Sequence, residues 1–152
     1  RRPPRDPFNS MLSLGYTLLM YEIYPKAENE GLSPYYAVLH KKYANHPALI
    51  SDLMEEWRSV IVDSTVLSLV QGHEIKPDHF EYADDSQGVF LTKEGLSKFI
   101  NKFEKTMNRT SRYLLYDQAE RTMRKAIQEQ CYRMRIAVIN KDVNEYVPII
   151  IR

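Results

Sequence analysis

The chain has 152 residues and a net charge of +1, with 43% hydrophobic and 27% charged residues. These values are typical of one soluble globular domain. No apolar run approaches the roughly 18 to 20 residues that a membrane span needs. Residues 1–5, which read RRPPR, do not resemble a signal peptide. The single Cys131 excludes an internal disulfide and fits a reducing compartment. We therefore expect a cytoplasmic protein with no membrane association.

Helical patterns dominate the first half of the chain. Apolar residues recur at spacings of three and four over residues 8–24, which predicts a helix. Asp6 is a suitable cap, Pro7 occupies the first helical position, and Pro25 is expected to end the helix. A second, longer helix is predicted over residues 47–71, where an apolar stripe runs from Leu49 to Val70 before Gly72.

The second half begins with a short β-hairpin. Residues 80–82 and 89–91 flank a turn-forming segment. Thr92 is expected to cap a third helix that ends near Met107. A fourth helix is predicted over residues 111–139, followed by an extended tail. The predicted fold class is therefore mainly α, a multi-helix bundle lobe with a minor β-hairpin, as one domain over residues 1–152.

Positive charge is concentrated late in the sequence. Between Lys98 and Lys141 there are eleven Lys or Arg residues and four Asp or Glu, a local balance of +7. On the predicted fourth helix, Arg121, Arg124 and Lys125 fall at i, i+3 and i+4 and would share one face. Such a face suits contacts with nucleic-acid phosphates. A solvated face explains it equally well, and both interpretations stay open.

Acidic residues near the start of the second predicted helix are candidate metal ligands. Asp52 and Glu55 are three residues apart, so both carboxylates are expected on one face, and His40 precedes the helix. One imidazole with two carboxylates could hold Mg²⁺ or Mn²⁺. Such an ion can polarise a phosphoryl oxygen and lower the pKa of bound water. The same residues could also be the wet side of an amphipathic helix.

Read in order, the motifs of this chain resemble those of the CRISPR adaptation integrases, the metal-dependent endonucleases that insert new spacers into CRISPR arrays. The resemblance covers nearly the whole chain. It is carried by an opening RRPPRDPFN segment, a GLSPY turn, the VLH segment ending at His40, the SDLMEEWR helix that holds Asp52 and Glu55, VFLTKEG at residues 89–95, and the closing YVP. A departure occurs at residues 36–38, which read YAV where the family usually has a glycine.

The resemblance implies roles for particular residues. The family's metal-binding histidine falls on His40 and its second carboxylate ligand on Glu55, so these two are the expected catalytic residues. Asp52 matches a supporting or alternative ligand. The family's third ligand, a glutamate, lies on a helix upstream of the RRPPR segment. The family also has an N-terminal β domain that makes its dimer contacts. The resemblance thus implies that residues 1–152 are a catalytic lobe lacking both parts.

Two hypotheses for function follow. In the first, the chain belongs to a divalent-metal-dependent DNA endonuclease and integrase, in which a DNA 3′ hydroxyl attacks a phosphodiester in the CRISPR array. The resemblance implies DNA, a homodimer partner and a small partner protein of the adaptation complex, and the lobe alone is expected to be inactive. In the second, the chain is a non-enzymatic helical module that binds nucleic acid or protein through its basic helix. Metal binding that depends on His40 and Glu55 would distinguish them.

Overall fold

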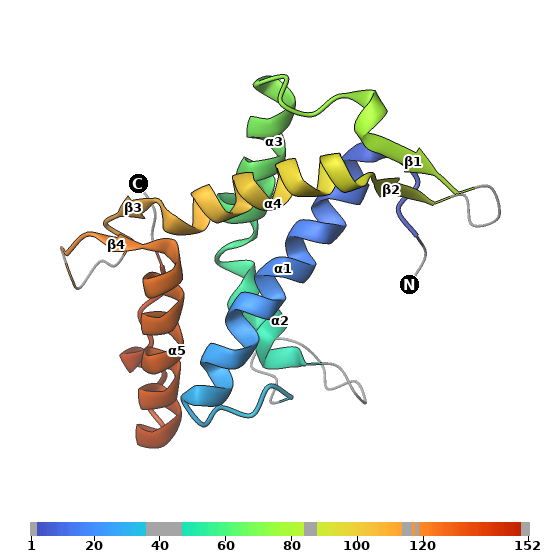
Figure 1. Ribbon diagram of the computed structural model, residues 1–152. Helices are drawn as coiled ribbons and strands as arrows, with labels where there is room; N and C mark the ends of the chain where they lie inside the picture. The colour runs from blue at the N-terminus through green and yellow to red at the C-terminus, as the bar shows by residue number, and fades with distance from the viewer. Residues whose placement is uncertain (1–2, 36–46, 84–87, 114–116, 118, 150–152) are drawn as a thin grey trace.

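The computed structural model describes residues 3–35, 47–83, 88–113, 117 and 119–149. The described part is mainly helical with two small antiparallel strand pairs, as the sequence predicts (Figure 1). In chain order its elements are α1 (Pro7–Asn29), α2 (Ala48–Glu55), η1 (Arg58–Asp63), α3 (Ser64–Gln71), η2 (Pro77–His79), β1 (Phe80–Tyr82), β2 (Val89–Leu91), α4 (Lys93–Asn108), β3 (Thr110–Ser111), β4 (Arg121–Thr122), α5 (Met123–Asn140) and η3 (Val143–Glu145).

Helix α1 begins where the sequence predicts and ends later. The Asp6 carboxylate accepts a hydrogen bond of 2.9 Å from the Asn9 backbone amide, and Pro7 opens the helix. Pro25 lies inside the helix, which continues to Asn29, so the predicted stop at Pro25 is wrong. A proline removes one internal hydrogen bond. Burial of helix residues on both sides of it, Ile23 and Ala27, offsets that loss.

The second predicted helix is helical along its length but is not one α-helix. After α2 the backbone turns through a π-helical segment, η1, before it continues as α3. A π segment holds more residues per turn than an α-helix, so it rotates the apolar stripe relative to a continuous α-helix. Trp57, Ile61, Val62 and Val66 are all fully buried as a result. The choice between α and π thus depends on packing against α1.

Helix α1 crosses the middle of the molecule and contacts α2, η1, α5 and β2 (Figure 1). Gly15 permits the close approach of η1, because a Cβ at this position would lie only 2.5 Å from Cγ1 of Val62. No helix in the described part of the chain is long and apolar enough to cross a membrane.

The hairpin and α4 confirm the sequence prediction. Phe80 pairs with Leu91 in β1 and β2, and the Thr92 hydroxyl accepts a hydrogen bond of 3.2 Å from the Gly95 amide at the start of α4. The fourth helix does not start at residue 111 as predicted. Strands β3 and β4 pair first, with Thr110 opposite Thr122. Helix α5 then begins at Met123, capped by Thr122. A β pairing therefore replaces the first turns of the predicted helix.

Candidate functional site

The three candidate metal ligands lie on or near α2. His40 is outside the described residues. Asp52 is buried, with 6% of its surface exposed, whereas the Glu55 side chain is 48% exposed. The two carboxylates therefore have different surroundings, although their spacing predicts a shared face. Within the described residues, no three His, Cys, Asp or Glu side chains are grouped closely enough to hold a metal ion. Asp52 and Glu55 alone thus provide a partial donor set.

Glu55 ends a chain of polar contacts that reaches α1. Its carboxylate accepts a hydrogen bond of 2.6 Å from Arg58. The Arg58 guanidinium lies 4.5 Å from the centroid of the Tyr16 ring, within the range of a cation–π contact. The Tyr16 hydroxyl donates a hydrogen bond of 2.8 Å to Asp63. Burial, together with the Asp63 hydrogen bond and charge, raises the pKa of Tyr16, so this hydroxyl keeps its proton. Any cation bound by Glu55 would share that carboxylate with Arg58.

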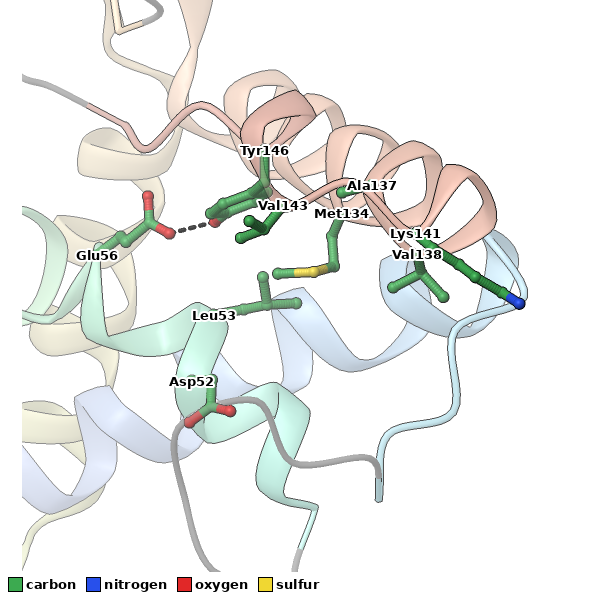
Figure 2. Close-up of a pocket in the computed structure, with 9 residues that line it drawn as sticks. All are labelled: Asp52, Leu53, Glu56, Met134, Ala137, Val138, Lys141, Val143 and Tyr146. Atoms are coloured by element: carbon green, nitrogen blue, oxygen red, sulfur yellow. Dashed lines mark hydrogen bonds between the residues drawn. The ribbon is translucent and has the colours of Figure 1, made fainter.

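A pocket of about 460 Å³ lies between α2 and the C-terminal part of the chain (Figure 2). Its lining is mostly apolar, with one carboxylate from α2 and one from the residue directly after that helix. The lining residues are Asp52, Leu53, Glu56, Met134, Ala137, Val138, Lys141, Val143 and Tyr146. The helix that carries the candidate ligands thus forms one wall of this pocket, and α5 with the segment that follows it forms the other.

Glu56, directly after α2, is hydrogen-bonded to the C-terminal segment. Its carboxylate accepts hydrogen bonds from the Tyr146 hydroxyl (Figure 2) and from the Ile149 backbone amide, the latter at 2.7 Å. Gln130 of α5 donates to the Tyr146 oxygen at 3.1 Å and accepts from the Trp57 indole at 2.8 Å. Burial, followed by the nearby Glu56 charge, raises the pKa of Tyr146. Both walls of the pocket are thereby joined through polar contacts.

The motifs and periodicities of the sequence did not predict this network. The available signal was Gln130, a polar residue on the otherwise apolar face of α5 beside Ile127 and Cys131, and all three are buried. A buried amide requires hydrogen-bond partners. Its partners Trp57 and Tyr146 come from other elements, so their identity depends on the packing.

The predicted basic stripe is not a single helix face. Arg121 lies in β4 and forms an ion pair with Asp117. Arg124 lies in α5, where its Nη2 is 2.7 Å from Glu22 and 2.9 Å from Glu104. Lys125 is exposed. The arginines are thus held in ion pairs, and Arg124 joins three helices. A role of these residues in binding DNA remains a prediction.

The comparisons with known proteins identify the class of this lobe. The family model "CRISPR associated protein Cas1" matches residues 1–105. The chain therefore belongs to the Cas1 family, which confirms the resemblance seen in its motifs.

The chain is 47% identical over 109 residues to "CRISPR-associated endonuclease Cas1 3" of Thermus thermophilus, a match that covers 71% of this chain and 32% of the relative. It is 38% identical over 129 residues to "CRISPR-associated endonuclease Cas1" of Mycobacterium tuberculosis, covering 85% and 38%. The chain thus spans about a third of the length of these relatives.

Solved structures share the fold. A casposase bound to its integration product superposes with a TM-score of 0.81 at 25% identity, covering 91% of this chain and 39% of the casposase chain. A chain of a Cas6-RT-Cas1–Cas2 complex also gives a TM-score of 0.81, at 27% identity, covering 96% of this chain and 16% of that one. Both likenesses cover a larger share of this chain than the family model, which matches residues 1–105.

Proposed function

We propose that this chain is the helical catalytic lobe of a DNA endonuclease and integrase that inserts spacer DNA into a CRISPR array. In this reaction a DNA 3′ hydroxyl loses its proton and attacks a phosphodiester of the array, so that a new P–O bond forms while the bond to the array's own 3′ oxygen breaks and that oxygen leaves as a hydroxyl. The observation that carries the proposal is the family match over residues 1–105, because this range includes the acidic residues of α2. The fold likeness to a casposase bound to an integration product supports the same chemistry.

We further propose that the reaction depends on Mg²⁺ or Mn²⁺ held by His40, Glu55 and Asp52. The chemistry of the donors fits, since carboxylate oxygens are the ligands that hard divalent cations prefer. When bound, the ion would stabilise negative charge that develops on the phosphoryl oxygens. Arg58, which pairs with Glu55, would orient that carboxylate and offset its charge before the ion binds.

DNA and two protein partners belong to the proposal. The Cas1–Cas2 complex among the structural neighbours supports a small partner protein of the Cas2 kind. A homodimer formed through an N-terminal β domain, and a further glutamate ligand preceding this chain, would complete the enzyme. His40, Glu55 and Asp52 would leave several coordination positions of a divalent ion to water, so we expect the 152-residue chain alone to bind Mn²⁺ weakly and to cut DNA poorly.

Strand transfer by the full-length protein that carries this chain tests the proposal. We expect His40→Ala and Glu55→Gln each to reduce Mn²⁺-dependent joining of a labelled duplex to a repeat-containing plasmid by more than about 100-fold, the order of effect when a group that acts in the transition state is removed. Glu81→Gln, at an exposed position on β1, is the matched control. The melting temperature should change little in Glu55→Gln, since an exposed ion pair is worth about 1 kcal/mol or less.

The same experiment separates the alternative function. If the substituted proteins keep their activity, or if joining proceeds unchanged in excess chelator, the assigned metal site is wrong. If Mn²⁺ binding measured by calorimetry does not depend on Glu55, the acidic face of α2 is only solvated. The non-enzymatic binding module would then be the better description.

A further inference from the structure

A row of positive side chains follows one face of α4. Lys98, Lys102, Lys105 and Arg109 are spaced at i, i+4, i+7 and i+11, which places all four on the same side of the helix and its immediate end. At 1.5 Å per residue the row is roughly 16 Å long, with a cation about every 5 Å. We call these four residues the α4 basic row. Lys93, at the start of the same helix, falls on the opposite side.

A groove of about 630 Å³ between α3 and α4 runs beside this row. Its lining is polar and includes no aromatic side chain among the described residues: Ser64, Ser68, Lys102, Glu104, Lys105, Thr106, Asn108 and Arg109. The acid in this lining, Glu104, already pairs with Arg124 at 2.9 Å. The positive charge of Lys105 and Arg109 is therefore not offset by the groove itself.

Glu74, which lies just after α3, is affected by the positive charges of several residues of the row. Its carboxylate lies 2.5 Å from the Lys102 ammonium. The hydrogen bond from Lys102, together with the charges of Lys105 and Lys98, lowers the pKa of Glu74. Three lysines of the row thus act together on one exposed carboxylate, which occupies the kind of position that a phosphate oxygen would take.

Two members of the row have cationic groups available for a ligand. Among the described residues, the side chains of Lys105 and Arg109 form no hydrogen bond or ion pair, and both residues are exposed. Long cationic side chains on a rigid helix suit a polyanion whose charges follow a line. The absence of an aromatic platform in the groove argues against recognition by base stacking.

We propose that the α4 basic row binds the phosphodiester backbone of duplex DNA, with Glu74 as an internal competitor for the same cations. The inference rests on the proposed function, because it assumes that DNA is the partner. It adds a contact surface on α4 that is formed by other residues than the acidic ones of α2, and that borders Arg124 through Glu104. Backbone contacts position a duplex and carry no sequence information, so binding at this row should not depend on sequence.

Salt-dependent binding of a 30-base-pair duplex to the full-length protein in EDTA tests the row without requiring catalysis. Removing two phosphate contacts with Lys105→Ala and Arg109→Ala should lower the slope of log K against log salt by about 1.8 and weaken binding at 0.1 M salt by tens-fold. Glu74→Gln should tighten binding. The control, Lys76→Ala with Lys93→Ala, removes two exposed lysines outside the row and should leave both quantities unchanged.

The outcomes discriminate between the possible ligands. With single-stranded DNA of equal length, the paired row variant should lower the slope of log K against log salt by a smaller amount, about 1.4. An unchanged slope in the paired row variant, or weaker binding in Glu74→Gln, would overturn the proposal. If the slope is unchanged but the paired row variant no longer binds the Cas2-like partner, the row is a protein-docking surface, and the proposal is likewise overturned. Because Asp52 and Glu55 are intact in these proteins, failure of the row leaves the strand-transfer test unaffected.

Discussion

Gln130 allows a quantitative test of how the two walls of the pocket are joined. The Gln130→Met substitution keeps the length of the side chain but removes its hydrogen bonds to Trp57, Tyr146 and the Leu53 carbonyl. The Tyr146 hydroxyl keeps its hydrogen bond to the Glu56 carboxylate. The Trp57 indole, fully buried, loses its acceptor. Leaving one buried donor unpaired costs about 1 to 3 kcal/mol. In a chain of this size, a loss of about 2 kcal/mol in the free energy of unfolding lowers the melting temperature by roughly 4 to 8 °C.

Urea unfolding followed by circular dichroism measures this loss in the free energy of unfolding. Its signal does not rely on the fluorescence of Trp57, the single tryptophan, which the test itself perturbs. A double-mutant cycle with Trp57→Phe gives the sharper result. Replacing both members of the pair leaves neither an unpaired indole nor an unpaired amide oxygen, so the double substitution should cost about 1 to 2 kcal/mol less than the sum of the two single ones. Additive losses, or a change below about 0.5 kcal/mol in Gln130→Met, would refute the reasoning.

Two more predictions concern contacts between distant parts of the chain. Arg124→Met should lower the free energy of unfolding by about 1 to 2 kcal/mol in the absence of DNA, because it breaks partly buried ion pairs to α1 and α4; equal stability would show that these pairs contribute nothing. Tyr146 has a raised pKa in the folded protein relative to its ordinary value of 10.0. Its contribution is therefore fully present below pH 10 and is lost as the pH rises above that value. Over that range the stability of the unsubstituted protein should fall more steeply than that of Tyr146→Phe, by up to about 1.4 kcal/mol per pH unit; parallel pH profiles would contradict this.

Several elements could be predicted because short-range signals specify them. The Asp6–Pro7 start of α1, the β1–β2 hairpin, and α4 between Thr92 and Asn108 all agree with local capping and periodicity. Each depends on residues within a few positions of one another. The family was recognisable for a related reason, since its motifs are contiguous stretches of sequence, and the family match over residues 1–105 covers all of them except the closing YVP.

The candidate site was only partly predictable. The spacing of Asp52 and Glu55 correctly places both on α2, but does not show that one is buried and the other is paired with Arg58. That difference arises from what packs against the helix. The network at Glu56 was missed because its partner, Tyr146, is 90 residues away in the sequence.

Local patterns of residues were enough to predict the family, the mainly helical class and the ends of elements with strong caps. Packing between distant segments is the reason that Pro25 stays inside α1, that a π segment interrupts the acidic helix, and that β4 precedes α5. The same packing brings Arg124 to Glu22, 102 residues away in the sequence. A cap or an apolar stripe acts through neighbouring residues. Burial and charge pairing depend instead on which distant surfaces meet, and a linear pattern does not contain that information.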